Sequence, residues 1–144
     1  MTTITLADFN LSPDIILSQD EHRALLLLAL AGTGHTPDDS DDLLYELERA
    51  IVVADSFVPP DIVRMGSRVT YRTASDTRTV EIVYPAEADI AKGRISVLTP
   101  VGTALIGLRT GQSITWRTRD DRRQALTVVC VHQPPFDSDP PAAA

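Results

Sequence analysis

Hydrophobic residues recur at helical spacing in the first half of this chain and at strand spacing in the second half. One apolar stripe repeats every three or four positions, as on a helix that packs against a neighbour, and consists of Leu44, Leu47, Ile51, Ala54 and Val58. From Val63 onward the period changes to two, which is typical of half-buried strands. The pattern therefore predicts an α+β protein, with helices first and an antiparallel sheet after them.

The ends of the two predicted helices carry recognisable start and stop signals. Ser18 followed by Glu21 matches a capping box, which predicts a helix over 19–31 that the glycines after it end. Thr36 and Pro37 start a second helix, which we expect to reach Val58, where Pro59 and Pro60 end it. A linker over 32–35 is short enough to join the two helices as an antiparallel hairpin.

The second half of the chain alternates strands with turns. Turn signals lie at 75–76, 92–93, 110–111 and 120–121, and the segment 99–107, with proline near its start and glycine at its end, predicts a short helix. We therefore expect four parts. They are an amino-terminal arm or edge strand at 1–17, a coiled-coil-like hairpin at 18–58, a sheet domain at 61–132 and a disordered, Pro- and Ala-rich tail at 133–144.

Charge is unevenly distributed, although the net charge is only −7 over 144 residues. Residues 1–59 sum to −9, which disfavours nucleic-acid binding, whereas residues 60–125 sum to +4 and suit either solvated strand faces or a negatively charged partner. No apolar run is long enough to span a membrane, and the first residues lack the basic start of a secretory signal. A single cysteine, Cys130, excludes an internal disulfide and favours a cytoplasmic location.

Residues that could do chemistry are few. His22, His35 and His132 lie far apart with no nucleophile pattern beside them, and Cys130 alternates in phase with Leu126 and Val128, which predicts a small core residue. We therefore expect no catalytic residue, no cofactor and no metal.

One acidic cluster is chemically suggestive and comprises Asp38, Asp39, Asp41 and Asp42. Clustered carboxylates bind magnesium, but carboxylates in the first turns of a helix also stabilise it by about 0.3–1 kcal/mol each without any ligand. The helix-stabilising interpretation is the simpler one.

Residues 86–97 and 99–113 together resemble a signature of the bacterial Gre transcript-cleavage factors. The likeness runs through Glu-Ala-Asp, a glycine turn and Ile-Ser, then Thr-Pro and Ala-Leu-Ile-Gly, in the family's order and at compatible spacing. It extends over about residues 62–131 and implies the family's FKBP-like domain. Residues 65–69, 82–86 and 99–107 are more similar to the Rnk type within this family, the regulators of nucleoside diphosphate kinase.

The resemblance implies where the domain binds. Gre factors dock on the rim of the RNA polymerase secondary channel, partly through a turn that carries Ser-Pro. Its counterpart here is Thr99-Pro100-Val101, preceded by Leu98 where the family has a polar residue. The expected partner is therefore RNA polymerase, with no membrane and no sequence-specific nucleic-acid contact.

The resemblance also implies a role for the hairpin, but only in part. In Gre factors an acidic hairpin tip brings magnesium to the RNA 3′ end. Asp38, Asp39, Asp41 and Asp42 lie near the tip of the predicted hairpin, but an eighteen-residue helix, roughly 27 Å long, is shorter than a Gre arm. We therefore expect a non-enzymatic polymerase-binding regulator, in which these four aspartates contact a basic surface of the polymerase near the channel mouth. The alternatives are a true cleavage factor and an FKBP-like peptidyl-prolyl isomerase, for which the aromatic content of 5% is low.

Overall fold

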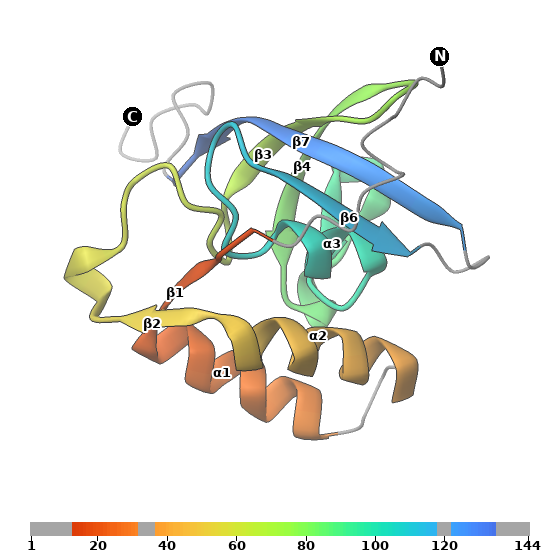
Figure 1. Ribbon diagram of the computed structural model, residues 1–144. Coiled ribbons are helices and arrows are strands. Elements are labelled where there is room, and N and C mark those ends of the chain that lie inside the picture. The colour runs from red at the N-terminus through yellow and green to blue at the C-terminus, as the bar shows by residue number, and fades with distance from the viewer. Residues whose placement is uncertain (1–12, 32–36, 118–121, 135–144) are drawn as a thin grey trace, which may run out of the picture.

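A helical hairpin lies beneath a curved sheet in the computed structural model (Figure 1). The structure describes residues 13–31, 37–117 and 122–134, without the side chains of 37–40 and 116–117. Its elements in chain order are β1 Ile16–Ser18, α1 Gln19–Ala31, α2 Pro37–Arg49, β2 Ile51–Val53, a 3₁₀ turn Asp55–Phe57, β3 Arg68–Arg72, β4 Thr77–Val83, two 3₁₀ turns Pro85–Glu87 and Ile90–Lys92, β5 Arg94–Ser96, α3 Pro100–Leu105, β6 Ser113–Arg117 and β7 Arg123–His132.

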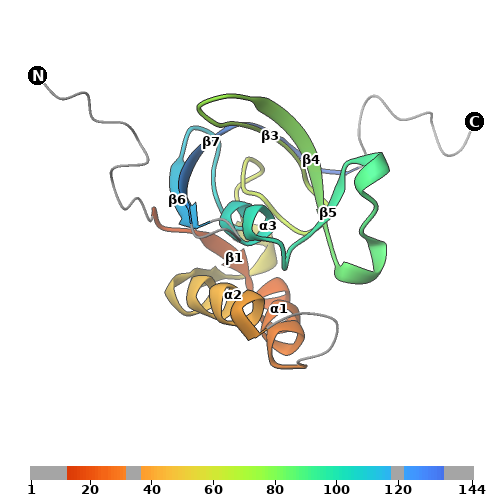
Figure 2. The ribbon, with the colours of Figure 1, turned by 90° about the vertical axis from the view of Figure 1, so that its right-hand side faces the viewer.

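The five-stranded sheet has the order β5-β4-β3-β7-β6 and curves around α3 (Figure 2). Its pairs are antiparallel, as expected, except that β4 and β5 are parallel. The two 3₁₀ turns between β4 and β5 carry the chain back along the last part of β4, so that Arg94 of β5 pairs with Glu81, which a tight hairpin cannot do. The α+β class and the mostly antiparallel sheet are confirmed, while the FKBP-like label stays a prediction.

The first helix has the predicted bounds, and the serine half of its capping box is formed. The Glu21 amide donates to the Ser18 hydroxyl at 3.0 Å. The second helix begins at Pro37 but ends at Arg49, so the prediction that it reaches Val58 was wrong. The Ile51 amide donates to the Ile15 carbonyl at 2.8 Å, and Ile51–Val53 become a strand that pairs in parallel with β1. These β-branched residues suit a strand better than a helix.

One hydrophobic core joins the hairpin to the sheet. Leu25 of α1 and Leu43 of α2 are fully buried in the same cluster as Ile106 and Leu126 of the sheet domain. Leu47 of the predicted stripe is buried as expected, but Ile51 is 47% exposed, because the helix has ended before it. A shared core means that the two helices pack along the domain instead of projecting from it as an independent arm.

Strand β1 is held against the sheet domain by Gly107. This glycine has φ +80°, and a Cβ at its position would lie 2.8 Å from Ile15 Cβ, so only glycine fits. The Ile16 amide donates to the Gly107 carbonyl at 3.1 Å, and Ile15 and Leu17 are buried. The last residues of the expected amino-terminal arm are thus packed on the sheet domain, with Ile16–Ser18 as strand β1, while residues 1–12 lie outside the described part.

A register shift in β7 changes the expected place of Cys130. Tyr71 pairs with Val128, but Thr70 pairs with Cys130, so Val129 is an extra residue on β7. Partners in a pair share a face of the sheet, so Cys130 lies on the outer face beside Thr70, and Val131 packs against the core instead. The prediction that Cys130 is a core residue in phase with Val128 was wrong.

Candidate docking site

The turn that contains Thr99, Pro100 and Val101 is held at its base by hydrogen bonds of the Thr99 side chain. The Thr99 hydroxyl accepts from the Gly102 amide at 3.0 Å and donates to the Ser96 carbonyl at 2.8 Å, which caps the predicted short helix, α3. Pro100 stands at the first helical position, where a missing amide costs nothing. The sequence itself thus specifies the conformation of this turn, through the Thr99 cap and Pro100.

Gly102 makes this turn possible by letting two stretches of backbone touch. A Cβ at Gly102 would lie 2.3 Å from the Ser96 carbonyl oxygen and 2.9 Å from Val97 Cα. The neighbouring Thr103 hydroxyl donates to the Val97 carbonyl at 2.7 Å, so α3 is anchored on the end of β5 at two points. Thr99, Pro100 and Val101 remain half-buried at the surface, whereas Leu98 is buried and offers little to a partner.

The predicted acidic tip lies at the start of α2, on the helix that contacts α3. Asp41 and Asp42 are exposed there, while the side chains of Asp38 and Asp39 lie outside the described part. Asp42 also contributes to raising the pKa of Glu46, although burial of Glu46 is the larger cause and Arg49 opposes both. The cluster therefore presents negative charge beside the sheet domain.

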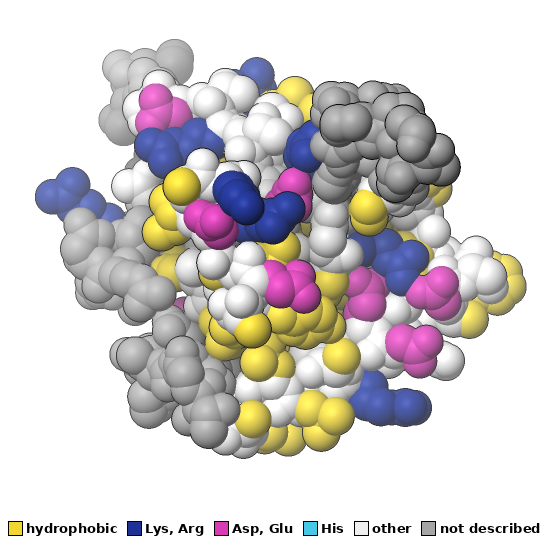
Figure 3. Space-filling view, turned by 180° about the vertical axis from the view of Figure 1, so that it is seen from behind, with side chains coloured by type: hydrophobic (Ala, Val, Ile, Leu, Met, Phe, Trp, Pro, Cys, Tyr) yellow, Lys and Arg dark blue, Asp and Glu magenta, His cyan; other side chains and the backbone are white. Residues whose placement is uncertain are grey.

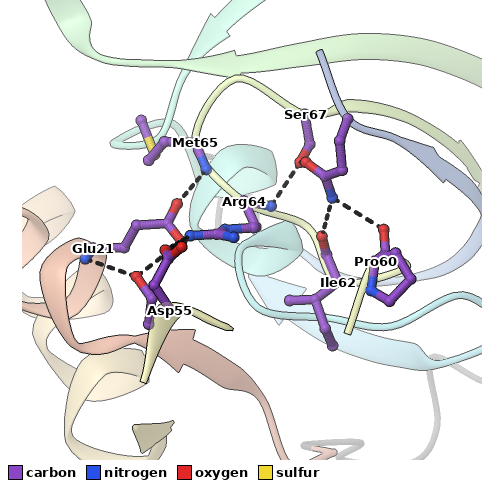
Figure 4. A network of polar contacts seen from close by, with 9 residues as sticks. Glu21, Asp55, Pro60, Ile62, Arg64, Met65 and Ser67 are labelled. Atoms are coloured by element: carbon purple, nitrogen blue, oxygen red, sulfur yellow. Dashed lines mark hydrogen bonds and ion pairs between the residues drawn. The ribbon is translucent and has the colours of Figure 1, made fainter. Parts of the chain in front are cut away.

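An ion-pair cluster that the sequence did not reveal joins α1 to the sheet domain (Figure 4). Glu21 accepts from Arg64 Nε at 2.7 Å and from the Met65 amide at 2.8 Å. Arg64 Nη2 forms an ion pair with Asp55 Oδ1. Burial alone would lower the pKa of Arg64, but the hydrogen bonds to Asp55 and Glu21 outweigh it and raise this pKa. We call Glu21, Arg64 and Asp55 the clamp.

The clamp continues into a second polar group at the entry to β3. Ser67 is fully buried, accepts from the Arg64 amide at 2.8 Å and donates to Gln133 Oε1 at 2.7 Å. Gln133 Nε2 in turn donates to the Ile62 carbonyl at 2.7 Å. These bonds fix the segment after Pro60, which connects the hairpin and β2 to β3. Gln133, which was expected to begin the disordered tail, is therefore held in place, and residues 135–144 lie outside the described part.

Much of the positive charge of the middle region is neutralised within the molecule. Arg68 and Arg94 both pair with Glu81, at 3.1 and 3.5 Å, and Arg109 pairs with Asp61 at 3.0 Å. On the face seen in Figure 3, basic and acidic side chains are interspersed, and hydrophobic side chains gather in its lower half. This favours the interpretation of the basic residues as solvated strand faces over an extended site for nucleic acid.

The part of the chain that the structure describes contains no cluster of three or more His, Cys, Asp or Glu residues that could hold a metal. His22 lies between the helices, with Nε2 3.0 Å from the Leu47 carbonyl oxygen, and His132 lies at the far end of β7. His35 is outside the described residues. The structure thus does not bring His22 and His132 together.

No helix among the described segments is long and apolar enough to cross a membrane.

Comparison with known proteins identifies the class. The family model for the carboxy-terminal part of the transcription elongation factors GreA and GreB matches residues 58–133, and the chain belongs to this family. The regulator of nucleoside diphosphate kinase of Escherichia coli K12 is 40% identical over 107 residues, which cover 72% of this chain and 78% of that protein.

Two further relatives agree with this assignment. Transcription elongation factor GreA of Pelobacter propionicus is 48% identical over 75 residues, 51% of this chain and 48% of that protein. A solved structure described as a prokaryotic transcription elongation factor GreA/GreB from Nitrosomonas europaea is 35% identical, with a TM-score of 0.65 over 84% of this chain and 99% of that one. The resemblance inferred from the motifs is confirmed, and these relatives are regulators or elongation factors by name, which supports a transcription-factor-like role.

Proposed function

We propose that this protein is a regulator that binds RNA polymerase at the rim of the secondary channel, in the cytoplasm, without stimulating RNA cleavage. In this proposal the sheet domain at 61–132 docks through Thr99, Pro100 and Val101. The capped, half-exposed turn supports this role, because a turn whose conformation is already fixed loses little conformational entropy on binding.

The short, domain-packed hairpin is the observation that carries the proposal. Each helix has 13 residues, and α2 is therefore about 20 Å long at 1.5 Å per residue. Leu25 and Leu43 are buried in the core of the sheet domain, so the hairpin does not project freely. Metal-assisted cleavage requires carboxylates placed to a fraction of an ångström, so a short hairpin that packs on the domain supports a regulator without cleavage activity.

In the proposed complex, the tip acids contact a basic surface of the polymerase near the channel mouth. Asp38, Asp39, Asp41 and Asp42 would add steering charge, which raises the association rate more than the affinity and weakens with salt. An effect on nucleoside diphosphate kinase, as named for the Escherichia coli relative, would then be indirect and act through transcription.

The test is direct binding to core RNA polymerase, with competition by GreB. The native chain should bind at micromolar concentration and displace GreB, and Pro100→Ala should weaken binding while Arg72→Ala, an exposed residue on the outer sheet face, should not. No detectable binding at micromolar concentration would refute the proposal.

Cleavage is tested separately in stalled elongation complexes supplied with magnesium. The native chain and Asp41→Ala should both leave the RNA uncleaved beyond the polymerase's own rate. Cleavage by the native chain that Asp41→Ala abolishes would instead establish a Gre-type cleavage factor.

A further inference from the structure

Ile90 is the most exposed large hydrophobic side chain among the described residues, at 87%. It lies in the segment 85–93 between β4 and β5, which passes along the outer side of β5 (Figure 2). Ala86, Ala88 and Ala91 of the same segment are exposed too. A single exposed isoleucine needs no explanation, but one that stands among exposed alanines belongs to a small apolar surface.

The backbone around Ile90 is held in place without any contribution from its side chain. Asp89 and Arg94 exchange two backbone hydrogen bonds, both of 2.9 Å. The Lys92 amide donates to the Asp89 carbonyl at 3.0 Å, and the Gly93 amide donates to the Ile90 carbonyl at 3.0 Å. Gly93 has φ +73°, a conformation that favours glycine. The fold therefore presents Ile90 on a hydrogen-bonded turn whose shape does not depend on burying it.

The same edge of β5 holds both this segment and the docking turn. Val97 donates its amide to β4, and alternate residues of a strand direct their backbone groups to opposite sides, so Ser96 and Arg94 direct theirs away from β4. On that side, Arg94 bonds to Asp89, and the Ser96 carbonyl accepts from the Thr99 amide at 3.0 Å. The two anchor points are two residues apart, roughly 7 Å along the strand. The surface around Ile90 is therefore adjacent to the docking turn.

We propose that Ile90 is a second contact with RNA polymerase, where it enters an apolar recess beside the site that takes the turn at 99–101. This inference rests on the proposed function. A standard interface covers about 800 Å² of each partner, a patch roughly 30 Å across, so a protein docked on the turn also covers the segment 85–93. Pro100 and Val101 are half-buried and offer limited apolar area, which the surface around Ile90 enlarges. A branched side chain on a hydrogen-bonded turn also loses little conformational freedom on binding.

The contribution of the side chain is tested by measuring affinity for core RNA polymerase. Ile90→Ser should weaken binding at least about tenfold, because burial of an isoleucine side chain contributes that factor or more. Ile90→Val keeps a branched apolar side chain and should stay within about fivefold of the native chain, since it removes one methylene group. Val129→Ser is the matched control: Val129 is 42% exposed on β7, which lies three strands away from β5, and its replacement should leave binding unchanged.

Burial of position 90 in the complex is tested by thiol modification. In a Cys130→Ser background, which removes the native thiol, Ile90→Cys and Val129→Cys each place a single thiol on the chain. Saturating core RNA polymerase should slow maleimide labelling of Ile90→Cys at least about tenfold, because a buried thiol is out of reach of the reagent. Labelling of Val129→Cys should proceed at the rate of the free chain. Gel electrophoresis separates the small labelled chain from the polymerase subunits.

The outcomes separate this inference from the proposed function. If Pro100→Ala weakens polymerase binding but Ile90→Ser does not, or if Ile90→Cys is labelled equally fast in the complex, this inference is overturned and the proposed function stands. If the native chain does not bind polymerase at micromolar concentration, the proposed function fails and this inference fails with it. Protection of Ile90→Cys by a higher concentration of the chain alone would assign the surface to self-association and would also overturn the inference.

Discussion

Replacing Glu21 by alanine should weaken the contact between the hairpin and the sheet domain and so lower the free energy of unfolding. The Glu21 side chain is 14% exposed and accepts hydrogen bonds from Arg64 Nε and the Met65 amide. Hydrogen bonds to a charged group contribute about 1.5–3 kcal/mol each, and the two are not additive because they share one carboxylate. Arg64 is 25% exposed and keeps Asp55, so water compensates part of the loss. We expect Glu21→Ala to lower the free energy of unfolding by about 2–3 kcal/mol.

Urea denaturation followed by circular dichroism measures this change, with an unchanged dependence on urea if unfolding stays two-state. The melting temperature should fall by about 5–10 °C. Glu21→Gln, which keeps the shape and one acceptor, should cost less than Glu21→Ala. Glu48→Ala, at an exposed position of α2, should stay within about 0.5 kcal/mol of the native chain. If Glu21→Ala is as harmless as Glu48→Ala, the clamp does not hold the hairpin.

Three other changes test separate features. Gly102→Ala should cost about 1–3 kcal/mol in urea denaturation, because its methyl group would overlap the Ser96 carbonyl, whereas Gly111→Ala, with no atom within 4 Å, adds only backbone strain. Ser67→Ala should cost about 1–3 kcal/mol, since Gln133 and the Arg64 amide both lose a buried partner. Burial raises the pKa of Glu46, so the folded state holds its proton more tightly than the unfolded chain. Stability from this group is complete below the unfolded pKa and is lost as pH rises through the folded pKa. The unfolding free energy of the native chain minus that of Glu46→Gln should therefore fall with rising pH across that window, and a rise would contradict the assignment.

Local signals in the sequence were sufficient to predict where several helices and the sheet begin. The Ser18–Glu21 capping box set the start of the first helix, and Thr99 with Pro100 set the start of α3, because caps act over three or four residues of the same chain. The change of hydrophobic period from Val63 onward predicted the sheet, and the motif over 86–113 indicated the family. Each of these features depends on neighbours in the sequence and is therefore visible without the fold.

Pairings between distant segments were decided only by the tertiary structure. The stripe Leu44–Val58 has helical spacing, yet the helix ends before Ile51. The Ile51 amide donates to the Ile15 carbonyl instead, and Ile51–Val53 form a strand parallel to β1. Cys130 changed face because β7 has an extra residue against β3, and Glu21 met Arg64 across 43 positions. The sequence by itself determined the caps, the periods and the family. The length of the hairpin, the pairing of β2 with β1 and the clamp were decided by long-range contacts, whose free energy exceeds the weak local preference of a few residues.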